Sequence, residues 1–214
     1  GFKEVRVHIT KGSFNKYLTV ADKVLHNKQS RIQINTNKCF FTRTELEYLG
    51  YWITRDGIQP IPKKVETIRN LATPKNKRDL RRFLGMVNYY RDMWKRRSHI
   101  LAPLTAITSA KSTWKWGAEQ EESFNNIKRV IAQEVLLAYP DFNVPFDVHT
   151  DASDKQLGAV ISQNGRPIAF YSRKLNKSQQ NYTTTERELL AIVETLKEFK
   201  NILLGHDIKV HTDH

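Results

Sequence analysis

The tetrapeptide Val-His-Thr-Asp occurs twice, at residues 148–151 and again at residues 210–213. Each copy ends a segment that has the alternation of a β-strand, and a helical pattern over residues 184–203 precedes the second copy. A strand–helix–strand connection usually returns the second strand parallel to the first. The repeat therefore predicts two adjacent parallel strands that bring Asp151 and Asp213 to one edge of a sheet.

Two more strands are expected between the repeats. Residues 157–162 and 168–172 are apolar and β-rich, and Asn164-Gly165 between them is a strong hairpin signal. Gly205 is a good helix C-cap. The chain from residue 146 onward thus predicts the order β-β-β-α-β, an α/β (α+β) fold with a mixed sheet.

The helix between the repeats supplies a third acid. Its apolar stripe, followed backward in steps of four from Leu196 through Ile192, reaches Glu188. A glutamate on a buried stripe is costly unless something compensates its charge. Glu186 falls on the more solvent-exposed side. We therefore expect Glu188, rather than Glu186, to join Asp151 and Asp213.

Three clustered carboxylates form an oxygen site that suits Mg²⁺ or Mn²⁺ better than Zn²⁺. Two such ions about 4 Å apart can activate water and stabilise the leaving oxygen in phosphodiester cleavage. A zinc site at His149, His211 and His214 is a weaker alternative, because the chain lacks the Cys/His spacing of zinc sites. Taken one at a time, each aspartate is best explained as a solvated strand-end residue, and only the combination of acids favours a metal site.

Residues 63 to about 135 have helical periodicity. Asn76 and Asp79 resemble a weak capping box, and Pro103 is expected to open a short helix. We expect Trp114 and Trp116 to pack in the core rather than to stack on bases. The apolar stripes of this segment are Leu80, Phe83, Leu84 and Val87, and later Phe124, Ile127 and Ile131.

The basic charge is concentrated in this helical segment. The chain carries a net charge of +13, and residues 61–100 alone hold twelve basic and three acidic side chains, a net +9. A solvated helix surface would explain an average run of charge, but this density, interleaved with aromatic side chains, favours a nucleic-acid partner.

The first sixty residues have a mixed pattern. Residues 14–29 predict a helix, and residues 31–35 and 45–53 predict one strand each. Residues 55–57, Arg-Asp-Gly, predict a turn. The prolines that follow, at positions 60 and 62, mark a boundary.

Composition narrows the cellular setting. No apolar run approaches the roughly 18–20 residues of a membrane-spanning helix, so no membrane partner is expected. The N-terminus lacks the apolar core of a signal peptide. The single cysteine, Cys39, rules out an internal disulfide and fits a reducing compartment, which predicts an intracellular protein.

Several motifs together resemble the reverse transcriptase and RNase H part of a gypsy-type LTR retrotransposon polyprotein. They include Tyr48-Leu49-Gly50-Tyr51, Gly57-Ile58-Gln59-Pro60, Arg82-Phe83-Leu84-Gly85-Met86-Val87-Asn88-Tyr89-Tyr90-Arg91, His149-Thr150-Asp151-Ala152-Ser153, Tyr171-Ser172-Arg173-Lys174-Leu175, Glu186-Arg187-Glu188-Leu189-Leu190-Ala191-Ile192 and Thr212-Asp213-His214. The resemblance covers nearly the whole chain.

This resemblance implies three domains. Residues 1–60 would be the end of the polymerase palm with its primer-grip hairpin, residues 61–137 a helical thumb or connection, and residues 138–214 a truncated RNase H-like domain. The catalytic and metal-binding residues would be Asp151, Glu188 and Asp213. The nucleic-acid-binding residues would be Leu49, Gly50, Tyr51, Lys77, Arg78, Arg81, Arg82, Tyr89 and Arg91.

The sequence departs from the family in two places. The stretch 2–5, Phe-Lys-Glu-Val, stands where the family carries the polymerase motif Tyr-x-Asp-Asp. The chain also ends before the last strand, helices and fourth acid of the RNase H fold. We therefore expect no polymerase chemistry and little or no turnover from the chain alone.

Three functions are compatible with these features. The first is a fragment of a reverse transcriptase/RNase H that binds an RNA–DNA hybrid or template–primer duplex, with the rest of the polyprotein as partner. When complete, such a protein synthesises DNA and hydrolyses hybrid RNA. The second is a non-enzymatic remnant that binds nucleic acid without sequence preference. The third, an interaction module without a nucleic-acid partner, would need an acidic protein to occupy the basic face.

Overall fold

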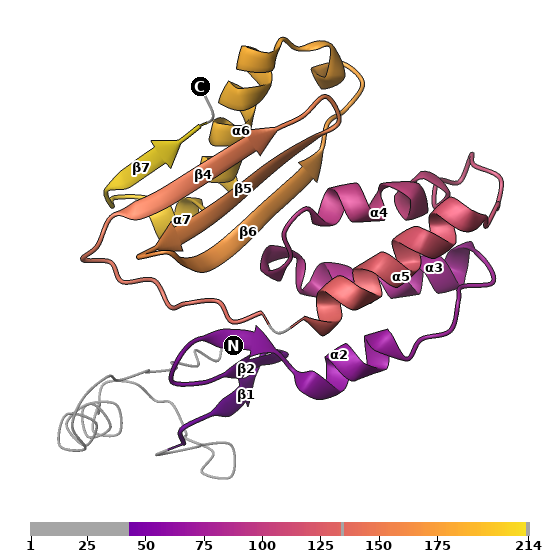
Figure 1. Ribbon diagram of the computed structural model, residues 1–214, viewed down its shortest axis with the longest axis horizontal. Helices are drawn as coiled ribbons and strands as arrows, with labels where there is room; N and C mark the ends of the chain where they lie inside the picture. Colours follow the sequence, from indigo (N-terminus) through magenta and orange to yellow (C-terminus); the bar gives the residue numbers. More distant parts are fainter. Residues whose placement is uncertain (1–42, 134, 213–214) are drawn as a thin grey trace, which may run out of the picture. The chain divides into compact units, whose positions relative to one another are not determined.

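The computed structural model describes residues 43–133 and 135–212, and its strands and helices belong to the compact unit Leu46–His214 (Figure 1). The strands are β1 Leu46–Tyr48, β2 Tyr51–Ile53, β3 Ile58–Pro60, β4 Phe146–Ala152, β5 Gln156–Gln163, β6 Arg166–Lys174 and β7 Ile208–His211. The helices are α2 Pro62–Arg69, α3 Lys77–Tyr89, η2 Arg91–Met93, α4 Arg97–Ala106, α5 Ala118–Ala132, η3 Gln179–Asn181, α6 Thr184–Glu198 and α7 Lys200–Leu203.

The prediction of one strand over residues 45–53 is wrong. The chain reverses at Leu49 and Gly50, whose φ angles are 45° and 77°, and β1 pairs antiparallel with β2. Two consecutive positive φ angles produce the tight turn of a two-residue hairpin. This is the hairpin that the family resemblance implies at these residues. The helix and strand predicted over residues 14–35 lie outside the described residues.

The helical segment α2–α5 encloses its own core, as its apolar stripes predict. Leu80, Phe83, Leu84 and Val87 of α3 are buried, and so are Phe124, Ile127 and Ile131 of α5. Half of the predicted capping box is confirmed, because the Asn76 side chain accepts a hydrogen bond of 2.9 Å from the backbone N–H of Asp79. The Asp79 carboxylate accepts from the backbone N–H of Lys75 instead of that of Asn76. Trp114 and Trp116 stack on each other and pack against this core.

Two helix boundaries differ from prediction. Pro103 does not open a helix but lies inside α4, which begins at Arg97. The predicted helix over residues 184–203 is interrupted at Phe199, which separates α6 from α7. Phe199 is buried in the cluster that includes Val148. Packing of this large ring is thus associated with the break in the helix.

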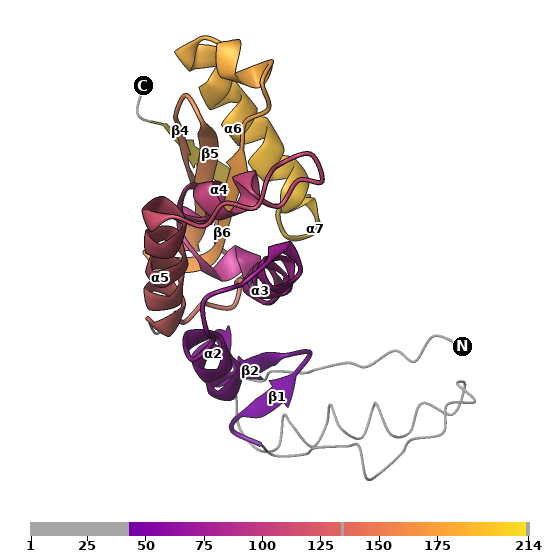
Figure 2. The same cartoon turned by 90° about the vertical axis from the view of Figure 1, so that its right-hand side faces the viewer.

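The C-terminal half forms the predicted mixed sheet, with strand order β6-β5-β4-β7. Strand β4 is antiparallel to β5 and parallel to β7, and β5 and β6 form the hairpin expected at Asn164-Gly165. Helices α6 and α7 cover one face of the sheet (Figures 1 and 2). The α/β class and the β-β-β-α-β order are therefore confirmed.

The connection that leads into β4 is held close to the turn between β2 and β3. Ile58 and Leu137 exchange two backbone hydrogen bonds of 2.9 Å each. The Tyr139 hydroxyl donates to the carbonyl oxygen of Thr54 at 2.8 Å and lies 3.1 Å from that of Gly57. These contacts fasten the β2–β3 turn to a segment some eighty residues away.

The helices of this unit are short or carry several charged side chains. Among residues 43–133 and 135–212, no helix has the length and apolar character needed to cross a membrane.

Candidate carboxylate edge and nucleic-acid interface

The two repeated segments lie side by side, as predicted. In the parallel ladder between β4 and β7, Val148 pairs with Val210 and His149 pairs with His211. The two imidazole rings stack with centroids 4.3 Å apart and an interplanar angle of 13°. In the sequence, an aspartate follows each histidine by two residues. Asp151 is exposed near the end of β4, and Asp213 lies outside the described residues.

Helix α6 distinguishes the two candidate glutamates. Glu186 completes a capping box, because its carboxylate accepts hydrogen bonds from the Thr183 backbone N–H at 2.8 Å and the Thr183 hydroxyl at 2.9 Å. These bonds lower the pKa of Glu186. Glu188 lies about one turn before the buried Ala191 and about two turns before the buried Thr195, and it is itself partly buried. Glu186 therefore has a role in starting the helix, which leaves Glu188 as the candidate ligand.

The donor chemistry of Asp151 and Glu188 fits Mg²⁺ or Mn²⁺. Asp151 and Glu188 offer hard carboxylate oxygens, as these ions prefer. No group of three His, Cys, Asp or Glu side chains able to hold a metal is found within residues 43–133 and 135–212. Asp213 lies outside those residues, so the trio of acids stays a prediction. The histidines have another arrangement, in which His211 Nε2 lies 2.9 Å from an Asp147 carboxylate oxygen.

The hairpin tip at Leu49 and Gly50 rests against the C-terminal end of α3. The Tyr90 hydroxyl donates to the Gly50 carbonyl at 2.7 Å, and the Tyr89 hydroxyl donates to the Leu49 carbonyl. The Tyr51 and Tyr89 rings stack with centroids 5.8 Å apart. Leu49 and Tyr89 nevertheless remain largely exposed. This arrangement leaves an aromatic and apolar surface exposed beside the hairpin tip.

Burial of Tyr90 makes the stability of this junction sensitive to alkali. Burial raises the Tyr90 pKa from 10.0 to about 12. Folding therefore favours the neutral phenol, and its contribution to stability is lost as pH rises from about 10 to about 12. We expect the urea midpoint of the wild type to fall over this pH range more steeply than that of Tyr90→Phe. Parallel curves for the two proteins would contradict the assignment, and Tyr182→Phe is the control at an exposed tyrosine.

The basic residues of α3 and η2 differ in how far the protein already uses them. Lys77 Nζ donates to the Ser109 carbonyl at 2.7 Å, and Arg81 Nη2 donates to the Thr108 carbonyl at 2.7 Å. Arg91 pairs with Glu198 at 2.6 Å. These three side chains bind neighbouring segments of the protein. Their residue type and spacing in the sequence do not predict this role.

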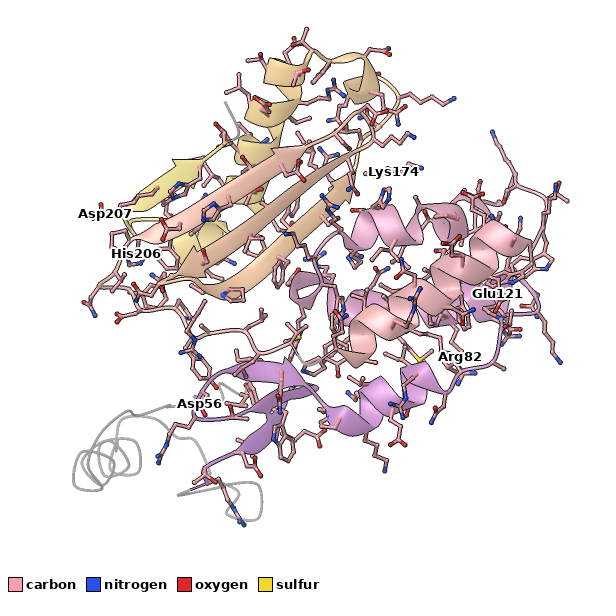
Figure 3. The ribbon with its side chains drawn as sticks, in the orientation of Figure 1. Asp56, Arg82, Glu121, Lys174, His206 and Asp207 are labelled. Atoms are coloured by element: carbon pink, nitrogen blue, oxygen red, sulfur yellow. The ribbon has the colours of Figure 1, made fainter. Side chains whose placement is uncertain are left out.

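Arg78 and Arg82 remain available on the same helix. Both side chains are exposed, and within the described residues neither has a hydrogen-bond or ion-pair partner (Figure 3 labels Arg82). Helical spacing places Arg78, Arg82, Gly85 and Tyr89 in one exposed row. A Cβ built on Gly85 would meet nothing within 4 Å, so space above the helix is open there. We call these four residues the α3 row.

Lys64 extends the α3 row. Its ammonium group lies 5.2 Å from the centre of the Tyr89 ring, within range of a cation–π contact. In the sequence, Lys64 is only one of the twelve basic residues of its segment. The sequence indicates only that Lys64 belongs to a helix that begins with a proline, Pro62. Nothing in the sequence places Lys64 next to Tyr89.

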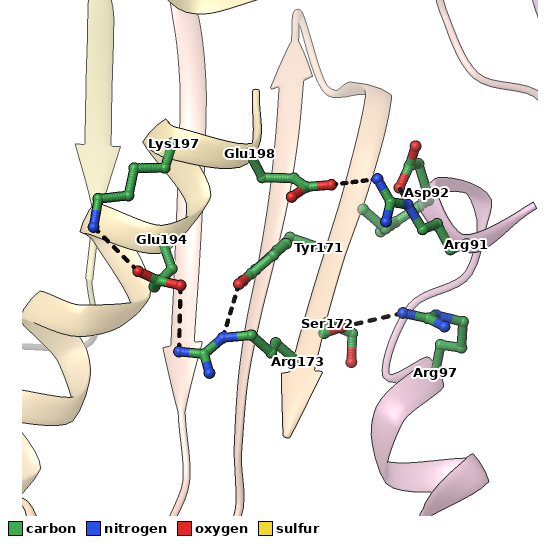
Figure 4. Close-up of a pocket in the computed structure, with 10 residues that line it drawn as sticks. Arg91, Asp92, Arg97, Tyr171, Ser172, Arg173, Glu194, Lys197 and Glu198 are labelled. Carbon is green, nitrogen blue, oxygen red and sulfur yellow. Dashed lines mark hydrogen bonds and ion pairs between the residues drawn. The ribbon is translucent and has the colours of Figure 1, made fainter. Parts of the chain in front are cut away.

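A pocket of about 310 Å³ lies between η2, the start of α4, β6 and α6 (Figure 4). Its charges largely pair with one another: Arg91 with Glu198 at 2.6 Å, and Arg173 with Glu194 at 3.4 Å. Arg97 Nη2 lies 3.4 Å from the Ser172 carbonyl, and burial lowers the pKa of Arg97. The pocket is therefore a charged seam that joins the helical segment to the sheet.

Known proteins resemble this chain in both sequence and fold. Residues 116–210 match the family model for the RNase H-like domain found in reverse transcriptase. The Pol polyprotein of transposon opus from Drosophila melanogaster is 39% identical over 202 residues, which cover 87% of this chain and 20% of that protein. The homologues of this chain are thus retrotransposon Pol polyproteins, the gypsy type among them. The gypsy polyprotein itself, from the same fly, is 38% identical over 198 residues, covering 86% of this chain and 19% of that protein.

A solved structure supports the same fold. The foamy viral protease–reverse transcriptase in complex with RNA/DNA hybrid superposes with a TM-score of 0.84 at 23% identity, covering 96% of this chain and 29% of that one. The chain thus spans about a fifth of the length of the curated relatives it matches.

Proposed function

We propose that this chain is the part of a retrotransposon reverse transcriptase/RNase H that holds an RNA–DNA hybrid, or a template–primer duplex, and carries part of the RNase H site. The observation that supports it most is the parallel pairing of the two repeated strands at Val148–Val210 and His149–His211. In the sequence, an aspartate follows each of these histidines by two residues.

Nucleic-acid binding is proposed for the α3 row and the hairpin tip. Arg78 and Arg82 offer positive charge that the protein does not already use, and Gly85 leaves space for a phosphate backbone to approach. Tyr89 and Leu49 add exposed ring and apolar surface. A positively charged stripe with aromatic side chains typically binds nucleic acid without sequence preference.

For hydrolysis, we propose that Asp151, Glu188 and Asp213 hold divalent cations. Bound Mg²⁺ would supply activation of water and stabilisation of the leaving oxygen in phosphodiester cleavage. The chain contributes fixed positions: Asp151 from a hydrogen-bonded strand, and Glu188 from the second turn of a capped helix. Polymerase activity of a complete protein and the domain boundaries after residues 60 and 137 remain proposals that rest on the resemblance. An intracellular location remains a proposal that rests on the single cysteine, Cys39.

Two pairs of substitutions on α3 test the binding face. Replacing Arg78 and Arg82 by glutamine should weaken hybrid binding roughly three- to tenfold at fixed salt. The slope of log K against log[salt] should become shallower by about 0.9 for each phosphate that is no longer neutralised. Stability should stay unchanged, since neither side chain has a described partner. Fluorescence anisotropy of a labelled RNA–DNA hybrid across a salt series measures both quantities.

The matched control removes the same charge from the same helix at Lys77 and Arg81. Because these two side chains bind the carbonyls of Ser109 and Thr108, their replacement by glutamine should lower the unfolding midpoint. Replacing Lys77 and Arg81 should change the salt slope less than replacing Arg78 and Arg82 does. Equal losses of binding by the two double variants would show that only net charge matters and would refute the α3 row.

A non-enzymatic nucleic-acid-binding remnant is the second candidate. The basic segment and the stretch 2–5, which lies outside the described residues, favour it. The two candidates differ in the role of Asp151. The remnant would be supported by two results together. Hybrid binding would be independent of divalent ions, and any cleavage would be unchanged by Asp151→Asn.

A further inference from the structure

Arg96 lies where the helical segment meets the end of β4. It precedes α4 with a φ angle of 54°, in the left-handed region, and its carbonyl accepts hydrogen bonds from the backbone N–H groups of His99 and Ile100 at 3.1 and 3.2 Å. Its side chain is two-thirds exposed, and Nη2 lies 3.9 Å from Asp151 Oδ2. Among the described residues this is the one ion pair found for Asp151.

Residues on either side of Arg96 are attached to β6 and to α6. The Ser98 N–H donates to the Ser172 hydroxyl at 3.0 Å, and Arg97 Nη2 lies 3.4 Å from the Ser172 carbonyl (Figure 4). On the other side, Arg91 pairs with Glu198 at 2.6 Å. The position of Arg96 is therefore set by its neighbours, and does not depend on the weak, exposed pair that it makes with Asp151.

Ser172, which contacts the residues after Arg96, lies in the same row of the sheet as Asp151. Asp151 pairs with Gly158, and Gly158 pairs with Ser172, so the three residues form one row across β4, β5 and β6. Directly opposed residues point to the same face of a sheet. A Cβ on Gly158 would meet only backbone oxygens at 3.8 and 3.9 Å, and Gly158 itself adds no side chain to this row.

This face is the one turned away from α6. Phe146, Val148 and Ala152 pack with residues of α6 and α7. Asp151 alternates with them along β4 and therefore points to the opposite face, where Arg96 lies. A guanidinium here reaches the candidate metal ligand without competing for space with α6.

We propose that Arg96 is an internal counter-cation of Asp151, which competes with Mg²⁺ for this carboxylate and so weakens metal binding while the helical segment is docked. The inference rests on the proposed function, because it takes Asp151 as a metal ligand. A guanidinium held within 4 Å of Asp151 Oδ2 weakens the attraction of this carboxylate for a second cation. Entry of Mg²⁺ then requires the Arg96 side chain to swing away from Asp151.

Metal binding to the full 214-residue chain tests this directly. Free Mn²⁺ gives a six-line electron paramagnetic resonance spectrum whose amplitude reports unbound ion, and competition with Mg²⁺ gives the Mg²⁺ affinity. The variants are Arg96→Gln and Arg96→Gly, the second of which suits a φ of 54° and guards against misfolding. Arg129→Gln removes the same charge from an exposed position on α5. Each variant is also measured with Asp151→Asn.

Both Arg96 variants are expected to bind Mg²⁺ roughly three- to tenfold more tightly than the wild type, as an exposed charge at this range allows. Arg129→Gln should change the affinity far less, and Asp151→Asn should remove the gain. If the Mg²⁺ affinity depends on Asp151 but is equal in the Arg96 and Arg129 variants, the proposed competition is wrong and the proposed metal site still stands. No Asp151-dependent binding in any of these proteins overturns the competition and the proposed metal site together.

Discussion

Gly57→Ala is expected to destabilise the chain by about 3 kcal/mol, because the added methyl group has no space and disrupts a pair of backbone hydrogen bonds. A Cβ at Gly57 would lie 2.2 Å from the Leu137 carbonyl oxygen. That oxygen belongs to the backbone and already accepts from the Ile58 N–H at 2.9 Å, so it cannot move without breaking the bridge. Urea unfolding followed by far-UV circular dichroism measures the loss.

Gly85→Ala is the matched control, and it should have the opposite sign. Gly85 lies within α3, and its Cβ would meet nothing within 4 Å. Alanine in a helix is favoured over glycine by roughly 0.5–1 kcal/mol, so the unfolding midpoint should rise. An unchanged midpoint in Gly57→Ala would contradict the close approach of residues 57 and 137.

The sequence predicts most of the elements whose side chains alternate or repeat regularly. The stripe of Leu80, Phe83 and Val87 predicts α3, and Asn164-Gly165 predicts the β5–β6 hairpin, because each pattern depends on local geometry. The turn at Asp56-Gly57 is predictable for the same reason. The use of Gly57 as a point of contact with Leu137 is not, because the partner lies eighty residues away.

The errors arise where tertiary packing overrides a local signal. Residues 45–53 contain mostly strand formers, yet Tyr89 and Tyr90 fix a reversal at Leu49-Gly50 through bonds to both carbonyls. Pro103 is a helix-start signal, yet α4 continues through it. Buried Phe199 coincides with the break between α6 and α7. None of these partners is close in sequence.

The candidate site divides in the same way. Selection of Glu188 over Glu186 is possible from helical spacing, and the capping role of Glu186 agrees with it. The sequence cannot distinguish the arginines that bind other parts of the protein from those that do not. Arg81 and Arg82 are adjacent residues of the same type, yet of the two only Arg81 binds the Thr108 carbonyl. Arg96 and Asp151 meet only because the helical segment docks on β6. The site roles themselves remain predictions.

Asp151→Asn is expected to reduce Mg²⁺-dependent cleavage of hybrid RNA by about 100-fold or more in a longer polyprotein that contains this chain. The amide removes a negative charge that holds an ion, and such an ion contributes several kcal/mol to these reactions, where about 1.4 kcal/mol corresponds to each tenfold in rate. Binding of the hybrid should be kept, because the α3 row is unchanged. Gel analysis of a hybrid labelled on the RNA strand measures cleavage.

Asp154→Asn provides the control for charge. Asp154 is exposed in the turn after β4, three residues from Asp151, and has no role in the proposed site. The same chemical change there should leave cleavage within about twofold of wild type. Equal losses in the two variants would indicate a general electrostatic effect and would exclude a specific role for Asp151.

Iron-mediated cleavage of a bound hybrid tests most directly whether this chain holds nucleic acid against the Asp151 edge. Fe²⁺ takes the place of Mg²⁺ at carboxylate sites, and with ascorbate and peroxide it generates hydroxyl radicals that cut only nearby chains. We predict strand scission at one defined position of the hybrid, together with protein scission beside Asp151, and loss of both in Asp151→Asn. Scission spread evenly along the hybrid, and unchanged by Asp151→Asn, would contradict this placement of the nucleic acid.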